Sequence, residues 1–182
     1  GLEAAAKFAR LFQENDRAAS YALAVLNIKK AVREHLFNSG EKRLIKGMYP
    51  RAGGGFDRDM AVDASTYAAF YFGLYEPGEE IINGTMKAIM ERLRSGGSGG
   101  IARYEGDEYY RSNPSVPGNP WVICTLWVAQ WIIAAARSPS DLRGALEIIN
   151  EVCGWAGPSG VLPEQVDPVT GYPLSASPLT WS

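Results

Sequence analysis

The sequence has few of the residues that metal centres and nucleophilic active sites require. Its 182 residues include one histidine and two cysteines. A Ser-His-Asp triad would have to use His35, and no pattern around that residue supports the role. Cys124 and Cys153 lack metal-ligand spacing and lie in apolar helical patterns, so both are expected to be core thiols. A zinc site and a catalytic triad are therefore not expected.

The sequence also lacks an excess of charge of one sign and a long hydrophobic run. Eighteen Lys and Arg against twenty Asp and Glu give a net charge of -2, without the basic stripe of a nucleic-acid-binding protein. The longest apolar run, 121–136, is interrupted by Thr125 and Gln130. It is shorter than the ~20 residues of a membrane span, which favours a buried helix. Residues 1–7 resemble neither a signal peptide nor a transit peptide. The compartment stays open, with the cytoplasm favoured.

Apolar periodicity and capping signals predict six helices. Their approximate bounds are 2–13, 16–36, 64–75, 79–94, 120–137 and 140–153. Asp16 and Asp63 are placed to cap the second and third helices, and Pro120 suits the first position of the fifth. A short strand or hairpin is predicted at 43–55. The Gly- and Ser-rich segment 95–100 has linker composition, but the large side chains after it argue against a domain boundary.

The connections between these helices alternate in length. Tight turns at Asn15, Pro77 and Ser138 join the helices into three pairs, and the long loops 38–62, 95–119 and the residues from 154 onward follow each pair. Long loops are therefore expected at one end of the helical array. This pattern is typical of part of an α/α barrel or of an α-solenoid. Because no repeat of fixed period marks a solenoid, the sequence predicts an all-α barrel-type chain.

Two of the long loops carry candidate functional residues. The loop 103–121 combines polar groups that bind hydroxyls in pairs with flat rings that stack on sugar faces. The polar clamp would be Arg103, Glu105 and Asp107, and the platforms Tyr104, Tyr109, Tyr110 and Trp121. The loop 160–165 presents one carboxylate, Glu164, beside Pro163. Both loops have a simpler interpretation, because surface charges often pair with each other and most glutamates are exposed without a catalytic role.

Three ordered motifs carry a resemblance to a known family. They are 103–107 (RYEGD), 119–127 (NPWVICTLW) and 162–167 (LPEQVD) with Thr170-Gly171. Together they resemble the glucoamylase and glucodextranase family of glycoside hydrolases (family 15), especially its prokaryotic branch, which includes trehalases. The segments 63–65 and 178–182 fit the same pattern.

The resemblance implies an (α/α)6 barrel that cleaves terminal α-linked glucose with inversion of configuration. It assigns Glu164 as the general base, and Arg103 and Glu105 as ligands of sugar hydroxyls. Trp121 matches an aromatic residue that shapes the pocket, and Tyr104 and Asp107 are placed in the same substrate site. No cofactor or metal is implied. Cleavage of α-1,4, α-1,6 and trehalose linkages all remain open.

The sequence departs from the family in one respect. The general acid of the family is a glutamate in an upstream Trp-Glu motif, and this sequence contains no Trp-Glu dipeptide. Three helix pairs are also half of the six in a full barrel. Residues 1–182 are therefore expected to be the C-terminal part of the catalytic domain, inactive without the N-terminal half of the barrel. The alternatives are a non-catalytic helical scaffold and a sugar-binding remnant.

Overall fold

The computed structural model describes residues 1–180 and divides the chain into two compact units. The first unit comprises residues 1–37 and the second begins at Asn38. The strand β1 (Phe37–Asn38) spans the junction between them. The predicted closing motif 178–182 is described only in part, because Trp181 and Ser182 lie outside the described residues.

The first unit is a helical hairpin of α1 (Leu2–Leu11) and α2 (Asn15–Ala31), and the π-helical turn η1 (Val32–Leu36) follows it. Its predicted pairing of helices is confirmed. The buried residues of the two helices are alanines, Ala6, Ala9 and Ala18, whose small side chains allow a close approach. The larger apolar side chains are exposed: Phe8, Leu11, Phe12, Leu23, Leu26 and Ile28. The prediction that Asp16 caps α2 is wrong, because the N-cap is Glu14 and Asp16 lies in the first turn of the helix.

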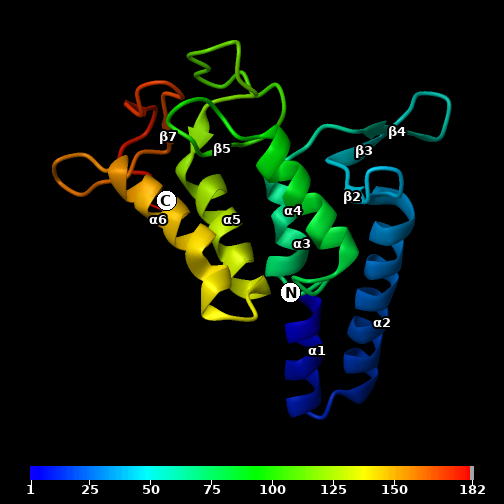
Figure 1. The fold of residues 1–182 in the computed structure, drawn as a ribbon. Helices are drawn as coiled ribbons and strands as arrows, with labels where there is room; N and C mark the ends of the chain where they lie inside the picture. Colours follow the sequence, from blue (N-terminus) through cyan, green and yellow to red (C-terminus); the bar gives the residue numbers. More distant parts are fainter. Residues whose placement is uncertain (181–182) are drawn as a thin grey trace. The chain divides into compact units, whose positions relative to one another are not determined.

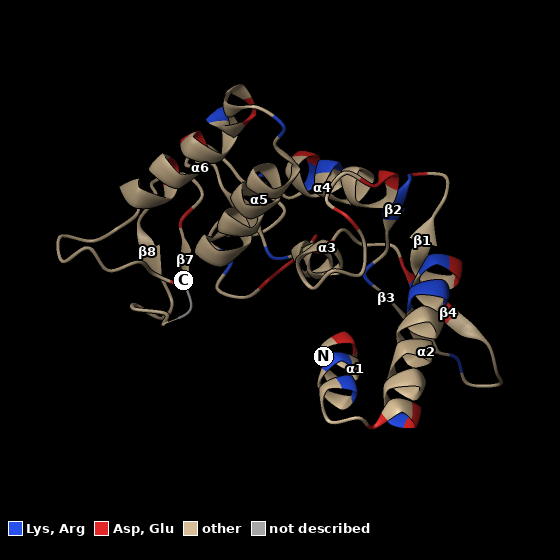
Figure 2. Ribbon diagram, turned by 90° about the horizontal axis from the view of Figure 1, so that it is seen from below, with Lys and Arg blue, Asp and Glu red and all other residues tan. Residues whose placement is uncertain are grey.

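The second unit contains the other helical segments. They are η2 (Ala64–Tyr67), α3 (Ala68–Tyr71), α4 (Glu80–Arg92), α5 (Val122–Ala135), η3 (Pro139–Leu142) and α6 (Arg143–Gly154). α5 and α6 lie side by side (Figure 1), and all residues of α5 are uncharged (Figure 2). Val122 of α5 and Val152 of α6 share a core cluster with Trp155 and Val166. Cys124 is buried as predicted, but the prediction for Cys153 is wrong, since it is exposed at the end of α6.

The predicted third helix, 64–75, is shorter in the structure. Asp63 caps its start as expected, because Asp63 Oδ1 accepts a hydrogen bond of 2.8 Å from the amide of Ser65. A 3-10 turn then leads into a single α-helical turn that ends at Tyr71. Gly73, with φ of +76°, takes the chain out of the helix. The apolar composition of this segment therefore did not determine helix length, and it predicted burial only in part, since Tyr67 and Phe70 are buried but Tyr71 and Phe72 are exposed.

A four-stranded antiparallel sheet joins segments that the sequence analysis assigned to loops and to the start of the fifth helix. Its strands are β5 (Ile101–Ala102), β6 (Pro120–Trp121), β7 (Gln165–Val166) and β8 (Pro173–Leu174), in that order. Two-residue strands are too short to leave an alternating pattern, so the all-α prediction is incomplete. Pro120 belongs to β6, and α5 begins at Val122.

The hairpin predicted at 43–55 is confirmed in outline. β3 (Gly47–Pro50) pairs antiparallel with β4 (Phe56–Asp59), after the short strand β2 (Arg43–Leu44). Gly53, Gly54 and Gly55 form its tip with positive φ. The hairpin projects from the helices of its unit (Figure 1).

The segment 95–100 is a packed turn within the second unit, which agrees with the expectation that it is not a domain boundary. Close contacts require glycine at two of its positions, Gly96 and Gly100. A Cβ on Gly96 would lie 2.3 Å from the carbonyl oxygen of Pro168, and one on Gly100 would lie 2.5 Å from the ring of Trp155. Both glycines also have positive φ. In the part of the chain that the structure describes, no helix has the length and apolar character needed to cross a membrane.

Candidate functional site

The sheet β5-β6-β7-β8 brings the two candidate loops together. Ile101 pairs with Trp121, Trp121 with Gln165, and Gln165 with Leu174. Arg103 follows the first strand of this row, and Glu164 immediately precedes the third. The amide of Val122 also donates to the carbonyl oxygen of Glu164 at 3.2 Å. Arg103 and Glu164 thus lie next to two strands, β5 and β7, that both pair with β6 in a fixed register.

Arg103 is held by a buried carboxylate. Its Nε and Nη2 donate to Asp107 Oδ2 and Oδ1 at 3.0 and 2.8 Å, and the side chain of Asp107 is 1% exposed. Burial lowers the pKa of Arg103, but the hydrogen bonds and charge of Asp107 outweigh that effect and raise it. Asp107 therefore holds Arg103 in place, and it is too deeply buried in this state to offer a hydroxyl-binding surface.

Aromatic rings surround the Arg103 guanidinium. Its central carbon lies 4.6 Å from the ring centroid of Trp121, 5.1 Å from that of Tyr104 and 5.5 Å from that of Tyr109. Cation–π contacts of this kind orient the planar group. Trp121 is almost wholly buried, and among the described residues 1–180 its indole Nε1 has no hydrogen-bond partner. The predicted platforms Tyr104, Tyr109 and Trp121 thus gather around one cation.

Tyr104 also contacts residues that the sequence analysis did not single out for the site. Lys46 Nζ lies 3.7 Å from the centroid of the Tyr104 ring and 3.8 Å from Asp63 Oδ2. Asp63 and Tyr104 form an isolated antiparallel bridge. The loop that carries Arg103 is therefore tied to the cap of η2 on one side.

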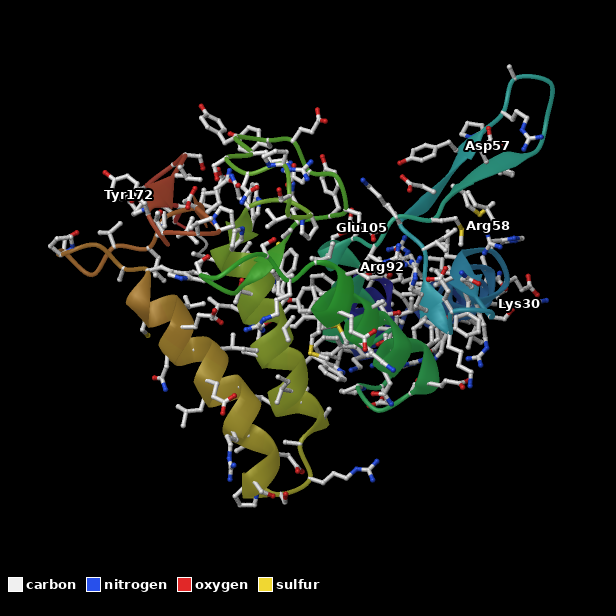
Figure 3. The ribbon with its side chains drawn as sticks, turned by 45° about the horizontal axis from the view of Figure 1, so that its top comes forward. Lys30, Asp57, Arg58, Arg92, Glu105 and Tyr172 are labelled. Atoms are coloured by element: carbon white, nitrogen blue, oxygen red, sulfur yellow. The ribbon has the colours of Figure 1, made fainter. Side chains whose placement is uncertain are left out.

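Glu105 is engaged by an ion pair. Arg92, at the end of α4, donates through Nε and Nη2 to its two carboxylate oxygens at 2.7 and 2.9 Å (Figure 3). The amide of Val62 also donates to Glu105 Oε2 at 2.7 Å. Both carboxylate oxygens are in use, so this arrangement favours a role in fixing the loop over the predicted direct contact with sugar. Arg92 was not recognised from the sequence, because an arginine in the last turn of a helix is common.

Glu164 is half-buried next to β7. Its Oε2 accepts a short hydrogen bond from Ser175 Oγ, which lies just after β8. The amide of Glu164 donates to the carbonyl oxygen of Ala176 at 2.8 Å. Ser175 has φ of 54°, in the left-handed region that few serines adopt. Backbone strain at this point is typical of functional sites.

Two buried amide side chains lie behind Ser175. Gln165 is fully buried and Asn119 is 1% exposed. Asn119 Nδ2 donates to Gln165 Oε1 at 2.8 Å, and Gln165 Nε2 lies 3.3 Å from Ser175 Oγ. Sequence reasoning missed all three residues as site components. The only signal was the presence of Asn119 and Gln165 inside the quoted motifs.

The described residues show no arrangement for a metal ion. Within residues 1–180, no group of three or more His, Cys, Asp or Glu side chains converges. Burial raises the pKa of the Cys124 thiol far above its usual value, which keeps it protonated. What the site does offer is a carboxylate, a guanidinium and an indole on adjacent strands, a set of groups suited to polyhydroxylated ligands.

Comparisons with known proteins agree with the motifs. The family model described as glycosyl hydrolases family 15 matches residues 1–155, which include Arg103 and Trp121 but not Glu164. An uncharacterized glycosyl hydrolase of Methanocaldococcus jannaschii is 28% identical over 191 residues, covering 100% of this chain and 29% of the relative. The chain thus spans less than a third of that relative.

Solved structures show the same fold. A bacterial glucoamylase in complex with acarbose has a TM-score of 0.80 and 24% identity, covering 100% of this chain and 30% of that one. The glucoamylase of Saccharomycopsis fibuligera has a TM-score of 0.70 and 17% identity, with coverages of 99% and 50%. The fold of this chain is therefore similar to part of each glucoamylase.

Proposed function

The chain belongs to family 15 of the glycosyl hydrolases, and on that basis we propose that it forms the C-terminal part of an inverting, exo-acting catalytic domain. The whole enzyme would release glucose from α-glucans or related α-glucosides. The observation that carries this proposal is the strand row, in which Trp121 pairs both with Gln165, the residue after Glu164, and with Ile101, two residues before Arg103. One side of a sugar-hydrolysing site needs a general base, a cation that binds hydroxyls and an aromatic wall.

Glu164 acts as the general base in this proposal. It removes a proton from water while the water oxygen bonds to the anomeric carbon, and the bond from that carbon to the glycosidic oxygen breaks. The leaving oxygen takes a proton from a general acid. Inverting enzymes place the two carboxyl groups roughly 6.5–9.5 Å apart, so that water fits between base and sugar. The sequence contains no Trp-Glu motif for the acid, so we place that residue elsewhere in the full-length protein.

The other site residues divide into those that would contact the sugar and those that hold the site in place. Arg103 uses two of its donor nitrogens on Asp107, and its remaining N–H groups would donate to sugar hydroxyls. Trp121 would form the wall of the pocket, with Tyr104 near the same guanidinium. We assign Asp107 and Glu105 to support, since Arg103 and Arg92 occupy their carboxylate oxygens.

The incomplete barrel is the second part of the proposal. We infer that the helix pairs form about half of an (α/α)6 barrel, and that this chain alone is inactive. The exposed apolar side chains of α1 and α2 support this inference, because a helical hairpin that buries mainly alanines has a large apolar face left over. The fitting partner is the N-terminal half of the same barrel.

The test uses the full-length protein that contains this chain. Maltose, isomaltose, dextran and trehalose would be offered, and the first anomer of glucose followed by NMR. We expect β-glucose from at least one substrate, and a 10²- to 10⁴-fold loss of kcat in Glu164→Gln, which is the usual range for a general base. A fully active Glu164→Gln enzyme would remove the assignment of the base. Release of α-glucose as the first product would remove inversion.

One observation favours a different class of function. The charged groups of the loop are paired, Arg103 with Asp107 in the same loop and Glu105 with Arg92 of α4, as in a structural module. A non-catalytic scaffold or a sugar-binding remnant has this property without hydrolysis. Absence of hydrolysis of all four substrates, with acarbose binding measured by calorimetry, would identify the remnant. Absence of both activities would identify the scaffold.

A further inference from the structure

A chain of hydrogen bonds runs from the protein interior to Glu164. It passes through the side chains of Asn119, Gln165 and Ser175, which we call the amide relay. Asn119 and Gln165 are 1% and 0% exposed. Burying amide groups costs free energy unless their hydrogen bonds are satisfied, and here every step of the relay has a partner. The relay also has a direction, which follows from the groups at its inner end.

Two backbone groups fix the orientation of Asn119. The amide of Ser112 lies 3.1 Å from Asn119 Oδ1, and a peptide N–H can only donate. The carbonyl oxygen of Tyr110 lies 2.8 Å from Asn119 Nδ2, and a carbonyl can only accept. A rotated Asn119 amide would set donor against donor and acceptor against acceptor. Only one orientation of this side chain is consistent with both contacts.

The orientation of Asn119 then determines that of Gln165. Asn119 Nδ2 has a second hydrogen, which it donates to Gln165 Oε1 at 2.8 Å. Gln165 Nε2 must therefore face Ser175 Oγ, and it donates to that oxygen at 3.3 Å. A serine hydroxyl has one proton to donate. With one lone pair occupied by Gln165, Ser175 directs that proton to Glu164 Oε2.

We propose that Asn119 and Gln165 are positioning residues for Glu164, acting through Ser175. They direct the Ser175 hydroxyl proton to Oε2 of Glu164. This hydrogen bond fixes the plane of the Glu164 carboxylate and leaves Oε1 to accept the proton of the attacking water. This inference rests on the proposed role of Glu164 as general base. Strand pairing supports this proposal. Gln165 pairs with both Trp121 and Leu174, so two neighbouring strands fix its backbone position. A purely structural role for the two amides predicts lower stability without a specific defect in the base.

The central variant is Gln165→Met, in the full-length protein. It conserves side-chain length and removes the donor to Ser175. The substrate is α-glucosyl fluoride, whose leaving group needs little protonation, so kcat reports mainly on the base. Hydrogen bonds to charged groups correspond to about 10- to 100-fold effects. We expect about a tenfold loss of kcat, with KM changed by less than about twofold.

A double-mutant cycle tests whether Gln165 acts through Ser175. Ser175→Ala alone should lower kcat by about tenfold or more. The double variant Gln165→Met with Ser175→Ala should fall no further than Ser175→Ala within about twofold. Multiplied losses would show that the two side chains act independently, and would overturn the relay. Where Gln165→Met does not fold, Asn119→Leu replaces it, because a side chain of similar size removes the donor that orients Gln165.

Azide provides a readout that a structural defect would not change. Azide forms a bond to the anomeric carbon as the carbon–fluorine bond breaks, and it loses no proton, so it needs no base. We expect azide to restore turnover to β-glucosyl azide in Glu164→Gln and to raise it in Gln165→Met. The matched control is Thr85→Val. Thr85 is 2% exposed on α4, accepts from the amide of Leu44 and donates to Ile81, away from the sheet. It should lose stability, keep its kcat and show no azide response.

The outcomes separate this inference from the proposed function. A fully active Glu164→Gln enzyme would overturn the role of the base and the relay together. An inactive, azide-rescued Glu164→Gln enzyme with a normal Gln165→Met enzyme would overturn the relay alone. A Gln165→Met defect confined to KM, or insensitive to azide, would also overturn it.

Discussion

Gly100→Ala should destabilise the protein far more than an alanine at another glycine of positive φ. Gly100 has φ of +79°, and a Cβ there would lie 2.5 Å from the Trp155 ring and 2.8 Å from the Cβ of Pro120. The matched control is Gly54→Ala, at the tip of the hairpin. Its φ is +99°, and a Cβ there would meet no atom within 4 Å. The two variants share the same chemistry and a left-handed backbone, and differ mainly in the clash.

The magnitude follows from separating these two contributions. A side chain in left-handed conformation costs about 1–2 kcal/mol, and this cost applies to both variants. The lower entropy of the unfolded chain with alanine offsets it by about 0.4–1 kcal/mol in both. Overpacking a filled core costs about 1–3 kcal/mol, and applies to Gly100→Ala alone. The difference between the variants should therefore be about 1–3 kcal/mol.

Thermal unfolding followed by tryptophan fluorescence measures this difference. For a domain of this size, 1 kcal/mol corresponds to about 2–4 °C in Tm. We expect Tm of Gly100→Ala to lie roughly 2–12 °C below that of Gly54→Ala. Equal Tm values for the two variants would refute the reasoning, since they would show that the 95–100 turn is not packed against Trp155.

Two further predictions concern charged groups. Replacing Arg92 by Met should lower the free energy of unfolding by about 1 kcal/mol or less, because the Arg92–Glu105 ion pair is partly exposed. Urea titrations in low and in high salt check this, and the decrease in unfolding free energy should be smaller in high salt. Hydrogen bonds from the backbone of Thr170, and then from Ser112, lower the pKa of Asp167 from 3.8 to about 2. Because the pKa of Asp167 is lower in the folded state than in the unfolded chain, its ionised carboxylate stabilises the fold at any pH above the unfolded pKa. The Tm of the unmodified protein should therefore exceed that of Asp167→Ala by the full amount above about pH 4, and by less as pH falls towards 2. A Tm difference that does not change with pH would contradict this.

The helices were predictable where periodicity and caps agree. α4 and α6 lie close to their predicted bounds, and Ser138 is the N-cap of η3, in a capping box with Asp141, whose carboxylate accepts from the amide of Ser138. The short helix after Asp63 was not predicted correctly, since the apolar composition of this segment suits a short turn as well as a longer helix. The four short strands were beyond prediction because their pairings are long-range, and two residues carry no periodicity of their own.

The candidate site was predictable in its members and less so in its contacts. Arg103 and Trp121 do lie together; their chemistry made them candidates, and the resemblance to the family gave each a role. The partners of Glu105 and Asp107 depend on burial and on residues elsewhere in the chain, which no local pattern encodes. Gln165 looked like an ordinary polar residue in a loop. Its importance in the structure comes from strand pairing with Trp121, a contact across forty-four positions.

The strand row also separates what must stay constant in this site from what is open to change. The row of Ile101, Trp121, Gln165 and Leu174 is held by main-chain pairing, whereas the connections 108–118 and 167–172 leave it and return. In the first connection, Tyr110 and Ser112 orient Asn119, so a change of length leaves the site intact only beyond them, at 113–116. The second connection is a hairpin loop, and its length sets the register of β7 and β8. Insertions and deletions at 113–116 can therefore reshape the surface near the strand row, while Glu164 and its neighbours keep their places.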